Sequence, residues 1–496
     1  MRMRRLPLLL PFLACLSLGA AAEEPALAAP EALVPADAAC FVRGEGLERL
    51  KTRLDAFCAS LPPALALPLR LSTGTALARP LIAAADGARP WGLVIMDAAR
   101  PEGPEGLALL LPVDDPELFR AVSASLVGIQ VRLVRGYAAL GADAALLDRI
   151  AKGGGGIPAP ALQESVVARF RPAAMAALPL LRRAWAGAMA SLPPALAEGL
   201  SARLPDLAAQ LDAVELGVSP GESGLRLGLR LRFCPGSQLA ALASAQKSRA
   251  PHWTGLAPPG AALSAEVHVD AAAGAAGARL LLPSSPSSPA RMTEALAASC
   301  AGDGALAVFR GDRGWQAQAV LKVTDPKAAA RFLAEGFQEL GARFGTACEM
   351  EFPVDAGSLH CQQARLVPPG LAVAGTVSRD LLVAAAGPES LERVKVTAEP
   401  LGDGLEPRVA PDLAAAMELL PPEASAYALC TPASLGALLS RLGGRPLHGG
   451  AGVVGAACRC EGGEAEFTMV VPGGALEAFP GWGGLAIRAG GLLVFP

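Results

Sequence analysis

The histidines are the side chains best suited to chemistry in this sequence, because imidazole titrates near neutral pH and binds metals. The chain has four of them, His252, His268, His360 and His448. His268 follows Glu266 by two residues, and in a β-strand this spacing places both side chains on one face. The pair could act as a general base. Alternating strands of this kind more often carry their polar residues on a solvated face, and we favour that interpretation.

Cysteines could form a crosslink, and the chain has ten of them. Cys348 and Cys361 flank a segment that we predict to be a loop, so they are the favoured disulfide pair in an exported chain. Cys40 and Cys58 are the next candidates, because they join a predicted strand to the helix that follows it.

A second use of cysteine is metal binding. Cys458 and Cys460 share one face of a predicted strand, and with Cys430 or His448 nearby they could hold a metal ion. Structural zinc sites usually show two-residue spacers and a second ligand pair, which this region lacks. We favour buried, small, apolar cysteines and predict no metal ligands.

The motifs of common catalytic and cofactor sites are missing from the sequence. It has no H-E-x-x-H, no G-x-S-x-G, no Walker A loop and no G-x-G-x-x-G after a strand. Glu461, Glu464 and Glu466 cluster at a predicted hairpin, where exposed carboxylates are ordinary. Asp115 and Asp325 each precede a proline and are explained as helix caps. We therefore predict no catalytic residue, no cofactor-binding residue and no cofactor.

The stretch 319–340, AVLKVTDPKAAARFLAEGFQEL, shows how the chain is built. Leu321 and Val323 alternate with polar residues, which predicts a strand. Asp325 and the proline after it predict the start of a helix, whose apolar residues then fall on one face. Similar openings, each an apolar strand followed by an amphipathic helix, begin near residues 35, 166, 258 and 421.

Pairs of alternating segments separated by Gly and Asp follow these openings and predict hairpins. The predicted fold class is therefore α+β, with duplicated strand–helix–hairpin–helix units and largely antiparallel sheets covered by helices on one face. The predicted halves are residues 31–250, with units at about 31–153 and 164–250, and residues 255–496, with units at about 255–395 and 413–496.

Some stretches have no strand or helix pattern. Residues 153–156, 283–289 and 341–357 are rich in Gly, Pro or Ser and are expected to be irregular connections. The segment 162–211 is rich in Ala, Leu and Met, and we expect helices that cover a sheet. The alternative is that these helices cover a lipid-binding groove or dock on a membrane surface.

The N-terminus predicts export. Arg2, Arg4 and Arg5 precede an apolar core, and alanines before Glu23 offer a cleavage site, so residues 1–22 are predicted to be a signal peptide. The alternative is a lipoprotein anchored through Cys15. No later stretch is long and apolar enough for a transmembrane helix.

The charge balance excludes one class of partner. The net charge is −3 and aromatic residues make up only 4% of the chain, so it lacks both a basic surface for phosphates and stacking platforms for bases. Nucleic acid is not an expected partner.

The openings with the pattern L-x-P-x-D/E-A, together with the strand–Asp-Pro–helix cassettes, resemble an exported bacterial family of unknown function with repeated α+β units. The resemblance covers most of the mature chain. It implies an envelope location and supplies no catalytic residues.

These observations predict an exported, periplasmic or extracellular, non-catalytic protein that acts as a binding or scaffold module. Its expected partner is a protein or another envelope component, with peripheral membrane or lipid contact left open. Two alternatives remain at this point: a periplasmic lipid or lipoprotein carrier, which needs a deep apolar cavity, and a hydrolase with an unrecognised site, which needs a cluster of His, Asp or Ser in a concave pocket.

Overall fold

The computed structural model of the chain describes residues 29–63, 66–67, 69, 84–96, 106–124, 128–153, 155–172, 205–270, 272–273, 276, 299–345, 348–356, 359–366, 371–402, 408–441 and 450–478. The chain divides into two compact units, which we treat separately. The N-terminal unit contains the described residues up to 172 and Leu211–Leu231, and the C-terminal unit contains residues 205–210 and the described residues from Arg232 to 478. The predicted signal peptide, residues 1–22, and residues 173–204 of the expected helical segment lie outside the described residues.

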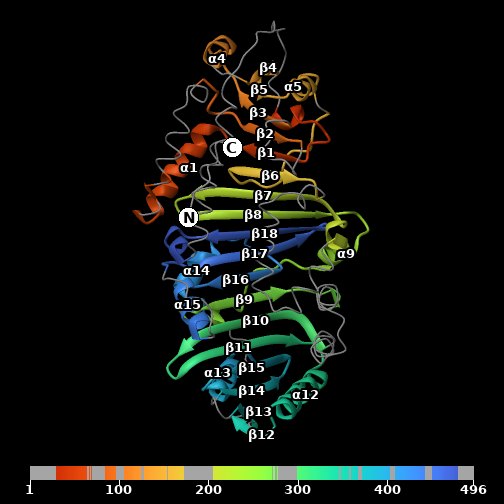
Figure 1. Cartoon of the computed structure of the whole chain (residues 1–496). Helices are drawn as coiled ribbons and strands as arrows, with labels where there is room; N and C mark the ends of the chain where they lie inside the picture. Colours follow the sequence, from red (N-terminus) through yellow and green to blue (C-terminus); the bar gives the residue numbers. More distant parts are fainter. Residues whose placement is uncertain are drawn as a thin grey trace. The chain divides into compact units, whose positions relative to one another are not determined.

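The N-terminal unit is built on an antiparallel sheet (Figure 1). Its strands are β1 (Cys40–Gly44), β2 (Trp91–Ile95), β3 (Leu107–Pro112), β4 (Gln130–Val134), β5 (Tyr137–Gly141), β6 (Val166–Phe170), β7 (Leu211–Gly221) and β8 (Gly224–Phe233). Hydrogen-bonded neighbours follow the order β4-β5-β3-β2-β1-β6-β7. The predicted strand pairs β2–β3 and β4–β5 are confirmed.

Helices cover both faces of this sheet. They are the 3-10 turn η2 (Pro30–Leu33) and the α-helices α1 (Leu47–Ser60), α4 (Pro116–Ser123) and α5 (Ala144–Ala151). Leu93 shares a core cluster with Leu50 of α1, whereas its neighbour Val94 shares another with Ile150 of α5. Adjacent strand residues point to opposite faces, so the expectation that helices cover one face is wrong. The strands are apolar on both faces, and each face therefore needs its own cover.

The C-terminal unit is a longer antiparallel sheet (Figure 1). Its strands are β9 (Leu263–His268), β10 (Cys300–Gly311), β11 (Gly314–Val323), β12 (Cys348–Ala356), β13 (Leu359–Leu366), β14 (Leu371–Ser378), β15 (Leu381–Ala386), β16 (Ala426–Cys430), β17 (Val454–Glu461) and β18 (Glu464–Val471). The pairing order is β12-β13-β14-β15-β11-β10-β9-β16-β17-β18.

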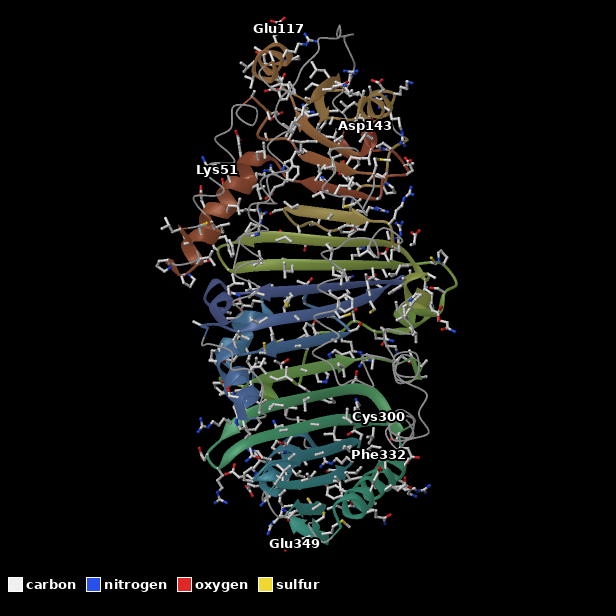
Figure 2. The ribbon with its side chains drawn as sticks, in the orientation of Figure 1. Lys51, Glu117, Asp143, Cys300, Phe332 and Glu349 are labelled. Carbon is white, nitrogen blue, oxygen red and sulfur yellow. The ribbon has the colours of Figure 1, made fainter. Side chains whose placement is uncertain are left out.

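This sheet also carries helices on both faces. They are α9 (Gln238–Ala245), η3 (Thr254–Leu256), α12 (Pro326–Phe344), α13 (Ser390–Gly402), α14 (Pro411–Met417), α15 (Pro432–Arg441) and η5 (Gly473–Ala478). Val383 of β15 clusters with Val394 of α13. The adjacent Leu382 clusters instead with Phe332 of α12 and with Cys300, both of which Figure 2 labels.

The expectation that residues 341–357 form an irregular connection is wrong. Here α12 continues to Phe344, and β12 and β13 then form a hairpin. Apolar and charged residues do alternate from Cys348 to Ala356, but Pro353 and the glycines of this stretch favour an irregular connection, and only the pairing of the two strands defines the hairpin. The register places Cys348 opposite Leu366 and Cys361 opposite Val354, so the expected disulfide between the cysteines does not form. Cys40 and Cys58 are not joined by a disulfide either.

The predicted helix caps are confirmed. The Asp115 carboxylate accepts the backbone N–H groups of Glu117 and Leu118, at 2.9 and 3.0 Å. Asp325 does the same at the start of α12, at 2.9 and 3.0 Å. Asp143 caps α5 in the same way (Figure 2). Among the helices that the structure describes, none has the length and apolarity to cross a membrane.

Candidate functional site

The polar face of β9 points into the C-terminal unit. Ser264, Glu266 and His268 are buried, whereas Val267 between them is half-exposed. The register pairs Glu266 with Tyr427 of β16 on one side, and His268 with Asp303 of β10 on the other. The expectation that Glu266 and His268 lie on a solvated face is therefore wrong. A buried carboxylate and a buried imidazole need partners, and the strand is surrounded by them.

Glu266 holds the segment that leads into β9. Its Oε1 atom accepts the backbone N–H of His252 at 2.7 Å. Its Oε2 atom accepts the backbone N–H of Trp253 at 2.9 Å and the hydroxyl of Thr254 at 3.0 Å. Since only 1% of Glu266 is exposed, these bonds replace the water that the carboxylate loses on folding.

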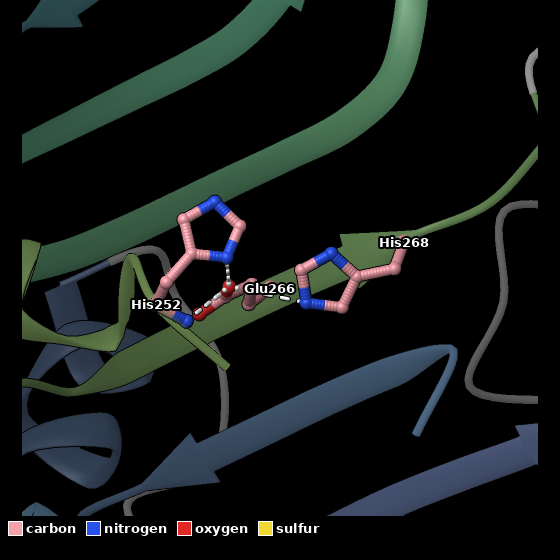
Figure 3. A group of neighbouring side chains, drawn as sticks. All are labelled: His252, Glu266 and His268. Atoms are coloured by element: carbon pink, nitrogen blue, oxygen red, sulfur yellow. Dashed lines mark hydrogen bonds and ion pairs between the residues drawn. The ribbon is translucent and has the colours of Figure 1, made fainter. Parts of the chain in front are cut away.

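Two imidazoles converge on the same carboxylate oxygen (Figure 3). His252 Nδ1 lies 3.2 Å and His268 Nε2 lies 3.1 Å from Glu266 Oε1. The two rings are stacked, with centroids 5.3 Å apart. The His268 side chain is fully buried, whereas 35% of the His252 side chain is exposed. The cluster is therefore closed on the strand side and open to solvent at His252.

A second carboxylate holds the other nitrogen of His268. Asp303 Oδ1 lies 3.3 Å from His268 Nδ1, and Asp303 Oδ2 accepts a 2.8 Å hydrogen bond from Arg249 Nη1. Backbone hydrogen bonds fix His268 and Arg249, the two residues on either side of Asp303. The His268 N–H donates to Ser425 O at 2.7 Å, and the Arg249 N–H donates to Ala424 O at 3.0 Å. The result is a linear arrangement of Glu266, His268, Asp303 and Arg249.

The charges of the cluster stabilise one another. Burial by itself raises the pKa of Glu266, but the neighbouring His268 imidazole and the hydrogen bonds from the N–H groups of His252 and Trp253 outweigh burial and lower it. Burial by itself lowers the pKa of His268, but the Glu266 and Asp303 carboxylates outweigh burial and raise it. The arrangement therefore favours an ionised Glu266 and a cation, either a proton or a metal ion, at His268.

Tyr427 closes the cluster from β16. Its ring meets the His268 ring edge-on, with centroids 6.5 Å apart. Its hydroxyl lies 3.2 Å from the backbone oxygens of Arg249 and Pro421, to either of which it can donate. Burial raises the pKa of Tyr427 to about 12, so the phenol stays neutral.

The cysteine pair lies on β17. Cys458 Sγ and Cys460 Sγ are 3.9 Å apart. Hydrogen bonding to Cys460 raises the pKa of Cys458, and the same bond lowers the pKa of Cys460. The register places Ala426, not Cys430, opposite Cys458, and His448 lies outside the described residues. Within the described part of the chain, the side chains grouped closely enough to share a metal ion are His252, Glu266 and His268.

The sequence pointed to the Glu266–His268 pair but not to its partners. Neither His252 nor Asp303 nor Arg249 lies next to this pair in the sequence. No local pattern marks them, because Asp303 reaches His268 only through the pairing of β9 with β10. The expected cluster of Glu461, Glu464 and Glu466 stays at the β17–β18 turn, where the Glu461 side chain is 72% exposed.

A cavity of about 430 Å³ lies elsewhere in the C-terminal unit. It is open to solvent and lies between α9 and the β17–β18 turn, and Arg232, Phe233, Ser237 and Glu464 are among the residues that line it. Its openness distinguishes it from the deep, enclosed apolar cavity that a lipid carrier requires.

The chain was compared with known proteins. No protein-family model matches it, and no curated protein matches it. Crystal form IV of TP0453 matches 47% of this chain and 96% of its own, with 10% identity and a TM-score of 0.27. Crystal form III matches 45% and 96%, with 9% identity and a TM-score of 0.26. Likenesses of this size carry no argument about fold or function.

Proposed function

We propose that this chain is an exported, non-catalytic protein of the cell envelope that binds a protein partner. The observation that carries the proposal is an apolar strip on the C-terminal unit. The strip comprises Val267, Leu306 and Phe467, with the smaller residues between them. These three are 37%, 40% and 40% exposed, on β9, β10 and β18 respectively.

The register makes the strip continuous. Val267 lies opposite Ala426, Ala426 opposite Cys458, and Cys458 opposite Phe467, which gives one row across four strands. Leu306 lies opposite Ala265 in the next row. Directly opposed residues in antiparallel strands share a face, so all of these side chains point away from the Glu266 face. An exposed apolar patch of this kind commonly marks an interaction site.

A protein partner fits the strip better than a lipid does. Lipid carriers enclose an acyl chain in a concave site, whereas these side chains are half-exposed on a sheet. A flat apolar centre is typical of protein–protein interfaces. The lipid or lipoprotein carrier remains the alternative that the experiment below must exclude.

The histidine–carboxylate cluster supports a non-catalytic role. Both oxygens of Glu266 already accept hydrogen bonds, and His268 is wholly buried. A general base needs to reach a substrate proton, and here the carboxylates contact the protein's own backbone and side chains.

We further propose that the two units share one repeated plan. The strand order β4-β5-β3-β2-β1-β6-β7 in the N-terminal unit corresponds to β14-β15-β11-β10-β9-β16-β17 in the C-terminal unit. In this alignment an Asp-Pro cap starts the helix after β3 and also the helix after β11. The helix after β5 clusters with its own sheet, as does the helix after β15.

Two details of the backbone support this plan. The bond from Glu45 N–H to Ser165 O corresponds to the bond from His268 N–H to Ser425 O, and both measure 2.7 Å. Among the described residues, the non-glycine positions with positive φ are Arg135 and Arg379, at 48° and 53°. Each occupies the tight turn between the corresponding strands, β4–β5 and β14–β15.

The partner proposal is tested by crosslinking in the cell envelope. A photoreactive amino acid replaces Leu306 or Phe467 in separate variants, with Lys327 on α12 as the exposed control position. We expect one defined protein to be crosslinked at both strip positions and not at the control. The purified partner should then bind wild-type chain at least about tenfold more tightly than Leu306→Asp. Crosslinks to lipid alone would favour the carrier, and crosslinks no different from the control would refute the strip as a binding site.

Export is tested separately by the intact mass of the chain purified from its own envelope fraction. A mature chain beginning at Glu23 supports the signal peptide. A diacylglyceryl group on Cys15 would instead support the lipid-anchored alternative.

A further inference from the structure

We propose that His252, Glu266 and His268 form a binding site for a zinc-like transition-metal ion. The proposal goes beyond the partner-binding function and does not depend on it. Figure 3 shows the three side chains pointing toward one another. Their ligand atoms, one from each residue, all lie within 4.8 Å of one another.

The distances suit a tetrahedral ion. Zinc binds imidazole nitrogen and carboxylate oxygen at about 2.0–2.2 Å, which places its ligand atoms about 3.3–3.5 Å apart. The two measured pairs, His252 Nδ1 to Glu266 Oε1 and His268 Nε2 to the same oxygen, are 3.2 and 3.1 Å apart. A small movement of His252, which belongs to the connecting segment before η3, completes the triangle. Two imidazoles with one carboxylate select zinc and its neighbours over calcium or magnesium.

His268 supplies an independent observation. Its Nε2 atom is buried and faces Glu266 Oε1 at 3.1 Å, in a geometry that does not suit a hydrogen bond. Asp303 lies at the opposite nitrogen, where it can accept Nδ1–H and so leave the Nε2 lone pair facing the carboxylate. Two electron-pair donors at this distance repel unless a proton or a metal ion lies between them, and a metal ion also satisfies His252 Nδ1, which faces the same oxygen. A carboxylate that orients a metal-binding imidazole in this way is a common feature of zinc sites.

The remaining bonds of Glu266 are compatible with an ion. Oε2 keeps its bonds from Trp253 N–H and Thr254 Oγ1, so the connecting segment stays attached. Oε1 accepts one backbone N–H and retains a lone pair for the metal. The exposed edge of His252 leaves a route for the ion and a fourth position for water.

The test uses the untagged full chain, because a histidine tag would bind the same ions. The protein is stripped with a chelator and titrated with Zn²⁺ against a chromophoric competitor, and in parallel with Co²⁺. We expect one Zn²⁺ per chain, and a Co²⁺ spectrum with visible bands but without the intense near-ultraviolet charge transfer of thiolate ligands.

His252→Ala is the deciding variant, because the side chain is partly exposed and its backbone N–H remains to bond Glu266. We expect it to weaken Zn²⁺ binding at least about tenfold and to abolish the rise in melting temperature that Zn²⁺ gives the wild type. Asp303→Asn should weaken binding by about 10- to 100-fold. The double variant Cys458→Ser, Cys460→Ser is the matched control for a thiol site and should bind as the wild type does.

Three results would overturn the site. They are the absence of stoichiometric Zn²⁺ binding to the folded wild type, unchanged affinity in His252→Ala, and a thiolate band that disappears in the cysteine double variant. Circular dichroism of each variant separates loss of metal from loss of fold. Partner crosslinking at Leu306 is read independently, so failure of the metal site and failure of the partner proposal are distinguishable.

Discussion

The first strand of each unit secures the 3-10 turn that precedes it, but the two units use opposite charges. In the N-terminal unit, Arg43 of β1 pairs with Glu31 of η2, with Nε and Oε1 3.0 Å apart. In the C-terminal unit, the corresponding position on β9 is Glu266, which accepts bonds from the segment before and within η3. A charged side chain at this strand position therefore binds the preceding turn in both units, as a cation in one and as an anion in the other.

The same comparison separates the contacts that hold the turn in both units from the groups that only the C-terminal unit has. The Arg43–Glu31 pair shows that this strand position contacts the preceding turn in both units, so the bonds of Glu266 to backbone N–H groups need no functional explanation. The two histidines and Asp303 are additional. The residue after β1, Glu45, stands where β9 has His268, and it pairs with Arg53 of α1 at 3.2 Å. The additional groups are the ones on which the metal site depends.

Removing the charged side chain that binds the turn should give the largest loss of stability. Glu266→Ala should destabilise the C-terminal unit by about 3–5 kcal/mol, because it leaves buried donors and His268 without their carboxylate. Arg43→Ala should cost the N-terminal unit less, about 2–3 kcal/mol, because it leaves the Glu31 carboxylate, 5% exposed, without its cation, but removing the Arg43 side chain, 38% exposed, lets water reach that carboxylate. Chemical denaturation measures both, and equal losses would contradict the comparison.

The second-largest difference between the units is expected at the position that Leu306 occupies in the apolar strip, which is buried in the N-terminal unit and half-exposed in the C-terminal unit. Leu93 of β2 and Leu306 of β10 correspond, but they are 8% and 40% exposed. Leu93→Ala should cost about 2–4 kcal/mol because it leaves a cavity beneath α1. Leu306→Ala should cost less than about 1 kcal/mol. A large loss for Leu306→Ala would mean that the strip is part of the core rather than a surface for a partner.

Alkaline pH should lower the stability of the C-terminal unit through Tyr427. The corresponding residue of the N-terminal unit is Val167, which does not titrate. The pKa of Tyr427 is raised from 10.0 in the unfolded chain to about 12 in the fold, so the neutral phenol is favoured by folding. The stability that it contributes is complete below pH 10 and is lost as the pH rises toward 12. We expect a loss of about 1–2 kcal/mol over this range. Tyr427→Phe should flatten that part of the profile, and an unchanged slope would refute the assignment.

The helix caps should give the smallest effect and the same one in both units. Asp115→Ala and Asp325→Ala should each cost about 1 kcal/mol, because each leaves two backbone N–H groups of the first turn without an acceptor. Lys327→Ala, at an exposed position in the first turn of α12, is the control and should stay within about 0.5 kcal/mol. A cap variant that loses binding without losing stability would contradict the structural role.

The features predicted correctly from the sequence are local. Asp325-Pro326 marks the start of α12 because a cap and a proline act on their own helical turn. The β10–β11 hairpin follows from Gly311 and Gly314 between alternating segments. The β12–β13 hairpin was missed although apolar and charged residues alternate along β12, because Pro353 and the glycines on either side of the strand favour an irregular connection.

The sequence by itself determined that Glu266 and His268 share a face, because side chains alternate along any strand. Only the tertiary structure decided that this face is buried, since helices cover both sides of the sheet and the pattern does not say which side is inside. It also decided the partners of the pair. Asp303 and Tyr427 reach β9 through strand register, and His252 through the turn that Glu266 holds. Contacts between distant segments depend on how the strands pair, and no residue spacing in the chain encodes that pairing directly.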